Sequence, residues 1–358
     1  MSYIPDNHLR SVAIYCHDSK DYSLSCMSQI LLKLGYSVDI LSVFDASADD
    51  INSYAYAIYI YDDGFSEISA LFDDYSGVLL IIYERTSPNL SSLRAYQHAH
   101  SLVRHQETQR QYLATWMQTN AERIFCLARS ELSAADLVRW GVKKTAVSPA
   151  ILPAFIPLNY GIHASKHIDS ADSITLLVYG DFAPDTGHKL VLYFMAAYRS
   201  LFKQSVRVYF SGQYFSEFCV YKEEVLLLAK LLKLSDSIEF EFIDSLAECR
   251  TFHQADIFLQ VDSFLQPTDA LHTAQAMGMP SFIINSSELP KASSLLPLSL
   301  VPFQAVARAV HDAVFCDIKR LQGIVEGYRF IAESRSFEAV EALFLSHILS
   351  AFYKKESL

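Results

Sequence analysis

Residues 173–202 read SITLLVYGDFAPDTGHKLVLYFMAAYRSLF, and this stretch decides the fold. An apolar run of strand length leads into a glycine-containing turn, GDFAPDTGHK, and a run with helical spacing follows it. A strand, a turn of this kind and a helix form a phosphate-binding arrangement when the turn can receive an anion. This turn instead carries Asp181 and Asp185, and its only cation, Lys189, stands at its far end. Two interpretations are therefore open: a polar turn that serves only the fold, and a residual phosphate site.

The same alternation continues on both sides of this stretch. Short apolar runs bounded by turn-forming residues predict strands, and these cover 11–17, 36–42, 54–61, 76–84, 123–128, 144–152, 173–179, 205–212, 237–243, 256–261 and 280–285. Apolar residues at helical spacing predict helices, and these cover 23–35, 64–75, 94–121, 130–141, 188–202, 216–234, 245–255, 269–278, 303–317, 317–333 and 338–354. Strands separated by single helices indicate βαβ units and parallel sheets.

The length of the chain and an aperiodic stretch near its middle predict two domains. A chain of 358 residues is too long for one ordinary domain. Residues 156–169 show no period and predict a linker. We therefore expect an α/β protein with two Rossmann-like, doubly wound domains, at 1–155 and 170–335.

Composition excludes some classes of partner. The formal net charge of −11 argues against nucleic acid, which requires clustered cations. No stretch is apolar enough to span a membrane, the N-terminus lacks the pattern of a signal peptide, and the six cysteines are scattered. These features predict a cytoplasmic protein with reduced thiols. Aromatic residues make up 13% of the chain, and this predicts a surface for a protein partner or peripheral contact with a membrane.

Histidines give two weaker signals. His98, His100 and His105 lie on one predicted helix, but no further ligand stands nearby, so we predict no metal site. His17 and Asp18 follow the first predicted strand, where they could act as a general base pair or cap a helix.

Several segments of the sequence, taken in order, resemble the corresponding segments of a known family. The second half of the chain resembles the donor domain of GT-B-fold glycosyltransferases of the retaining family 4 type. In that family the turn after the first donor-domain strand reads Gly-Arg, a variable stretch and Lys-Gly. The phrases that carry the resemblance are GDFAPDTGHK, LAKLLKLSDSIEFEFID, AECRTFHQADIFLQ, ALHTAQAMGMPSFI and AESRSFEAVEALFLSHI. The resemblance implies a GT-B fold whose C-terminal helix, 338–358, packs back on the first domain.

The resemblance also implies where a nucleotide sugar would bind. The family holds the donor diphosphate with the Arg and the Lys of the turn, and it uses two glutamates ahead of a Gly-x-Pro phrase. Here the Arg position is Asp181 and the Lys position is Thr186, while the glutamate positions are Leu265 and Thr273. A second alignment places the glutamates at Pro267 and Gln275. The positions that match the donor site are Gly180, Asp181, Thr186, Gly212, Leu265 and Thr273.

The acceptor side departs from the family in the same way. A family histidine near the end of the fourth strand corresponds to Glu84, which is followed by Arg85. The loop after the first strand, usually rich in glycine, begins with His17 and has no glycine before Gly35. His17, Glu84 and Arg85 are the candidate acceptor-side residues.

Two functions follow from the resemblance. The first is a catalytically impaired pseudo-glycosyltransferase in a glycan or glycoprotein assembly pathway. It would act as a partner, scaffold or regulatory subunit of another glycosyltransferase or of a second copy of itself. The second is an active retaining glycosyltransferase with altered donor contacts. Neither needs a cofactor, and a nucleotide sugar is the implied ligand.

Overall fold

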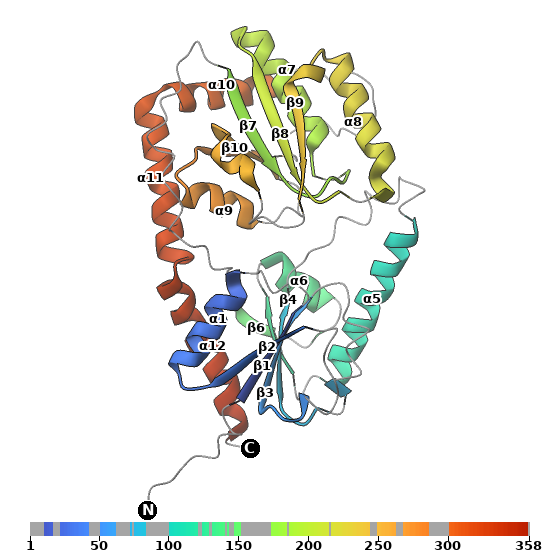
Figure 1. The fold of residues 1–358 in the computed structure, drawn as a ribbon, viewed down its shortest axis with the longest axis vertical. Coiled ribbons are helices and arrows are strands. Elements are labelled where there is room, and N and C mark those ends of the chain that lie inside the picture. Colours follow the sequence, from blue (N-terminus) through green and yellow to red (C-terminus); the bar gives the residue numbers. More distant parts are fainter. Residues whose placement is uncertain are drawn as a thin grey trace, which may run out of the picture. The chain divides into compact units, whose positions relative to one another are not determined.

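The computed structural model describes two compact units, which Figure 1 shows. Unit 1 contains the described parts of Met1–Thr86, Arg104–Ile156 and Glu333–Leu358, and unit 2 those of Ser87–Val103 and Pro157–Ala332. The described residues are 11–16, 22–42, 51–61, 72–73, 75–83, 100–120, 124–128, 131–139, 142, 147–151, 173–184, 186–214, 216–243, 249–262, 268–285 and 301–356.

Unit 1 contains a parallel sheet of six strands in the order β2-β1-β3-β4-β5-β6. The strands are β1 (Ser11–Cys16), β2 (Ser37–Ser42), β3 (Tyr56–Tyr61), β4 (Val78–Tyr83), β5 (Ile124–Ala128) and β6 (Val147–Ile151). Its helices are α1 (Tyr22–Lys33), α5 (His100–Thr119), α6 (Glu131–Arg139) and α12 (Phe337–Glu356). The chain order reverses between β1 and β3, which is the signature of a doubly wound sheet.

The two faces of the sheet in unit 1 bury separate cores. Successive residues of a strand point to opposite faces. Tyr15 of β1 therefore joins the cluster that contains Trp116 of α5, while Ile14 joins the cluster that contains Phe344 of α12. Helix α12 also contacts α1 through Lys33, whose Nζ lies 3.3 Å from Glu341 Oε1. Helices thus cover both faces, as a parallel sheet requires.

Unit 2 contains a parallel sheet of five strands in the order β11-β10-β7-β8-β9. The strands are β7 (Ile174–Tyr179), β8 (Val206–Gly212), β9 (Ile238–Phe242), β10 (Ile257–Asp262) and β11 (Ser281–Asn285). The helices are α7 (His188–Phe202), α8 (Cys219–Leu231), α9 (Thr268–Ala276), α10 (Val301–Phe315) and α11 (Asp317–Ser334), with short 3-10 helices at Ser216–Phe218 (η5), Ser235–Ser237 (η6) and Arg250–His253 (η8).

Helix α7 lies at the centre of the larger core of unit 2. All of its residues from His188 to Tyr198 are buried. Figure 1 shows α7 beside the sheet with α10 near it, and Tyr193 of α7 stacks on Phe303 of α10 with ring centroids 5.6 Å apart. Leu177 of β7 faces the opposite core, which contains residues of α9. The expectation of two doubly wound α/β domains is confirmed.

One expected helix is wrong in its described part. The sequence predicted a helix at 245–255, but the structure has only the short 3-10 helix η8 there. The Thr251 hydroxyl donates to the Glu241 carboxylate over 2.8 Å, and the Cys249 thiol lies 3.5 Å from it. Side chains that bond outside their own segment compete with helical geometry, and Cys249 itself is extended.

Replacement of Gly323 by alanine should stabilise the chain. Gly323 lies in the middle of α11, and a Cβ placed on it would meet no atom within 4 Å. Alanine is favoured over glycine in a helix by about 0.8–1 kcal/mol. We expect Gly323→Ala to raise the free energy of unfolding by about that amount in urea titrations. Gly327→Ala is the control, because its Cβ would lie 3.2 Å from Gln275 Cγ and offset the gain. Equal effects at the two positions would contradict this account.

Candidate functional site

The candidate site lies in unit 2, where the chain order of the sheet reverses between β7 and β10. Ligands of doubly wound proteins bind at such a point, outside the carboxyl ends of the strands. Strand β7 ends at Tyr179 and leads into the turn that begins at Gly180, while β10 ends at Asp262 ahead of α9. The turn singled out from the sequence therefore occupies the expected position.

The backbone of this turn is tied to its neighbours on both sides. The Gly180 amide donates to the Ser211 carbonyl over 2.9 Å, and the Phe182 amide donates to the Gln213 carbonyl over 2.7 Å. Gly187 has a φ of 79°, and a Cβ there would lie 2.6 Å from Cγ1 of Val261 in β10. Two of the amides that could hold a phosphate are thus committed to the fold.

Thr186, which the resemblance matches to a lysine, is buried. Its hydroxyl donates to the Ala183 carbonyl over 2.6 Å and lies 2.6 Å from Nδ1 of His188. Because a hydroxyl has one hydrogen, Nδ1 of His188 must be the donor in the second contact. The Thr186 side chain is therefore turned into the protein.

His188 is a buried, neutral histidine. Its ring lies 4.5 Å from the ring of Phe182 and 4.7 Å from that of Phe210, and Nε2 has no partner among the residues that the structure describes. Burial lowers the pKa of His188 to about 3. The imidazole thus supplies no positive charge to an anion at neutral pH.

Lys189 is engaged elsewhere. Its ammonium lies 2.6 Å from Oε2 of Glu224 in α8 and 5.2 Å from the ring centroid of Tyr221. Lys189 is only 8% exposed. The cation that the sequence placed at the end of this turn therefore pairs with Glu224 of α8.

None of the other described positions that the resemblance matches to the donor site carries a glutamate. Asp181 is half-buried directly after Gly180, and Thr273 is half-buried on α9. Asp269 lies in the first turn of α9, where an anion is favoured by the helix dipole. Leu265 and Pro267 lie outside the described residues. Acidic side chains thus stand near two places where a phosphate group would approach.

A cluster of aromatic rings next to the turn was not foreseen from the sequence. Phe240 and Phe242 alternate along β9 and therefore share one face of the strand. Phe242 lies 5.0 Å from Tyr214, and both rings are more than one third exposed. The Lys222 ammonium lies 4.7 Å from the centre of the Phe242 ring. The alternation FEF was the sequence signal for this surface, which can stack on a flat, apolar group.

The opposite face of β9 carries Glu241 in a polar network. Its carboxylate accepts hydrogen bonds from the Ser211 hydroxyl over 2.9 Å and the Thr251 hydroxyl over 2.8 Å. Burial would raise the pKa of Glu241, but these bonds, with those from Cys249 and the Arg250 amide, hold it below its usual value. Glu241 is therefore an ionised structural anchor between β8, β9 and η8.

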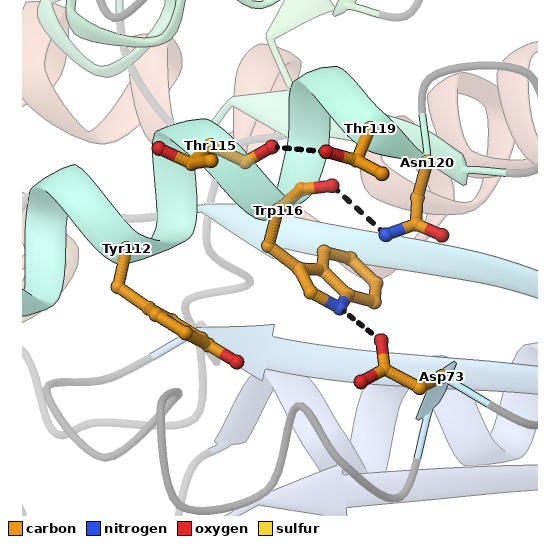
Figure 2. A pocket seen from close by; sticks show the side chains of 6 residues that line it. All are labelled: Asp73, Tyr112, Thr115, Trp116, Thr119 and Asn120. Carbon is orange, nitrogen blue, oxygen red and sulfur yellow. Dashed lines mark hydrogen bonds between the residues drawn. The ribbon is translucent and has the colours of Figure 1, made fainter.

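A separate hollow of about 550 Å³ lies in unit 1 (Figure 2). Trp116 and Tyr112 project from one side of α5, and the Trp116 indole donates to Asp73 Oδ1 over 2.7 Å. Its other lining residues are Thr115, Thr119 and Asn120. Since these residues precede β4 and β5, the hollow lies at the amino edge of the sheet, opposite the edge at which ligands of this architecture bind.

The acceptor-side candidates are not placed. His17, Glu84 and Arg85 all lie outside the described residues, as does His98. Within the described ranges, no three metal-binding side chains come together, and no helix is both long and apolar enough to cross a bilayer.

Solved structures show what this architecture is similar to. HepE of Anabaena, solved with UDP and glucose, aligns with a TM-score of 0.65 at 10% identity, covering 95% of this chain and 100% of its own. Sucrose-phosphate synthase of Thermosynechococcus elongatus aligns with a TM-score of 0.66 at 15% identity, over 96% of this chain and 100% of its own. A glycosyltransferase of Rickettsia africae aligns with a TM-score of 0.60 at 10% identity, covering 95% of this chain and 98% of its own.

Sequence comparisons add nothing to this likeness. No protein-family model and no curated protein matches the chain. At such low identity the structural likeness concerns the fold alone. The chain has the GT-B glycosyltransferase fold, with two Rossmann-like units.

Proposed function

We propose that this chain is a pseudo-glycosyltransferase, which keeps the GT-B fold but does not transfer sugar. The observation that carries the proposal is the state of the turn after β7. The position expected to hold a cation carries Thr186, whose hydroxyl bonds to Ala183, and the nearby Lys189 pairs with Glu224. Charge that develops on a leaving diphosphate needs fixed donors or cations aimed at it. Asp181 stands where the resemblance would place an arginine and Thr273 where it would place a glutamate, and both replacements support the same conclusion.

The proposed role is that of a partner or regulatory subunit in glycan or glycoprotein assembly. Ile318, Leu321, Val325 and Tyr328 form an apolar row along α11, and all four are exposed. A row of this kind supports contact with another protein, for which we propose a glycosyltransferase with intact Arg, Lys and Glu or a second copy of this chain. A cytoplasmic location and peripheral membrane contact stay predictions.

One observation favours the second candidate, an active enzyme with altered donor contacts. Helix α7 begins at His188 with no side-chain cap, so its N-terminal amides face the turn without a competing side chain. Tyr214 and Phe242 could stack on a nucleobase beside it. HepE was solved with UDP and glucose, and a uridine nucleotide is therefore the first ligand to test.

Replacement of Asp181 by asparagine tests the proposal. A unit charge at an effective dielectric near 20 repels another by roughly 1–2 kcal/mol at about 8–16 Å. We expect weak binding of UDP to the native chain, and binding about fivefold tighter or more in Asp181→Asn, measured by calorimetry. We expect neither protein to release nucleoside diphosphate from UDP-, GDP- or ADP-sugars.

Asp236→Asn is the matched control, because Asp236 is exposed in η6, at the amino end of β9. It should leave UDP binding unchanged. Turnover of any nucleotide sugar by the pure native chain would refute the pseudoenzyme and favour the second candidate.

A further inference from the structure

Arg320 of α11 is a buried arginine whose hydrogen bonds are incomplete. The residue is 8% exposed, and its Nη2 donates to Asp317 Oδ1 over 2.9 Å. Nε and Nη1 are buried and have no partner among the described residues. The Asp317 side chain is itself 61% exposed, so it compensates the guanidinium only in part. A buried charge with unsatisfied donors is costly, and it calls for a partner that brings negative charge.

Arg320 lines a cavity of about 80 Å³ within unit 2. Gln275 of α9 and Lys319 of α11 also line it, together with Ser281 at the start of β11 and Gly323. The cavity lies at the amino end of β11, so it is separate from the carboxyl edge that holds the turn after β7. It is therefore not part of the site described above.

Gln275 supplies the complementary group. Its Oε1 is buried and lacks a hydrogen-bond partner within the described part of the chain. A Cβ on Gly327 would lie 3.2 Å from Gln275 Cγ, so the glycine lets the amide approach α11. The cavity thus offers unpaired N–H donors and a second cation, Lys319, with one unpaired acceptor, the Gln275 oxygen.

The donors and the volume define the occupant. At about 80 Å³ the cavity is small, and it suits a group of only a few heavy atoms. Water alone would not neutralise the guanidinium. An anion that carries a hydrogen can also donate to Gln275 Oε1, which a fully deprotonated anion cannot do. We propose that this cavity binds a small oxyanion that retains one proton, the chemistry shared by hydrogenphosphate and bicarbonate.

Thermal unfolding of the full chain at constant ionic strength tests this site. Ligand that binds only the folded state raises its stability by mass action. At about ten times the dissociation constant, we expect phosphate or bicarbonate at pH 7 to raise Tm by about 2–4 °C. Sulfate, which carries no proton at this pH, should give a clearly smaller shift. An equal shift with sulfate would overturn the assignment of a protonated ion. The larger of the shifts with phosphate and with bicarbonate identifies which of the two ions the cavity prefers.

Two variants and a control make the result specific. Arg320→Met removes the charge and should abolish the shift. Gln275→Glu keeps the size of the side chain but places a carboxylate beside the guanidinium, so it should fold and also lose the response. Arg308→Met, at an exposed position on α10, is the matched control and should keep the full response. No shift in the native chain, or an equal shift in Gln275→Glu, would show that the cavity does not bind the anion.

Discussion

Gly212→Ala should destabilise unit 2 by about 3 kcal/mol or more, or prevent it from folding. Gly212 ends β8 with a φ of 150°, and a Cβ placed there would lie 2.1 Å from the carbonyl oxygen of Gly180. The obstructing atom belongs to the backbone of the turn after β7, so no side-chain rotation can relieve the clash. The ends of β7 and β8 lie close together because the Gly180 amide donates a hydrogen bond to the Ser211 carbonyl.

Urea unfolding followed by circular dichroism measures this effect. Gly323→Ala is the matched control, since the same added methyl group meets open space there. If Gly212→Ala unfolds within about 0.5 kcal/mol of the native chain, the close approach of the two turns is not a constraint on the fold.

The second large effect is a loss of stability in acid that depends on His188. The ordinary pKa of a histidine is 6.5, and burial lowers that of His188 to about 3. Between these values the unfolded chain binds a proton that the folded chain excludes. The contribution of neutral His188 is therefore complete above pH 6.5, and it falls by about 1.4 kcal/mol per pH unit as the pH drops toward 3.

His188→Phe should remove this dependence. Phenylalanine keeps a ring between Phe182 and Phe210, and the Thr186 hydroxyl keeps its bond to Ala183. We expect the variant to gain stability relative to the native chain as the pH falls, by about 2–3 kcal/mol at pH 4.5. Urea titrations at pH 7.5, 5.5 and 4.5 measure the difference, with exposed His253→Gln as the control. Parallel curves for native and His188→Phe chains would be evidence against the buried neutral histidine.

The sequence predicted the fold well because its signals are local. The strands are apolar runs bounded by turn residues, and the helix predicted at 188–202 has the bounds of α7. The reversal of strand order between β7 and β10 follows from the alternation of strands and helices in a doubly wound sheet. The helix predicted at 245–255 is only a short 3-10 helix at 250–253 in its described part, because Thr251 bonds to Glu241, a partner that periodicity does not reveal.

The candidate site was predictable only in part, for the same reason. The sequence located the turn and the replaced residues Asp181 and Thr186. It could not show that Lys189 pairs with Glu224, which lies 35 positions further along the chain. The incomplete bonding of Arg320 depends on contacts between α9 and α11, which no spacing along the chain encodes.

The burial of Thr186 limits how this protein could be re-engineered. A lysine stem that followed the path of the threonine side chain would place an ammonium beside the Ala183 carbonyl and the His188 ring, away from solvent. Desolvation of that charge would cost several kcal/mol, and the residue would lose its proton at neutral pH. A single substitution at position 186 therefore cannot restore the cation that the resemblance would place there. A designed cation needs a position from which a long basic side chain can reach water, such as the half-buried position 181 of the same turn.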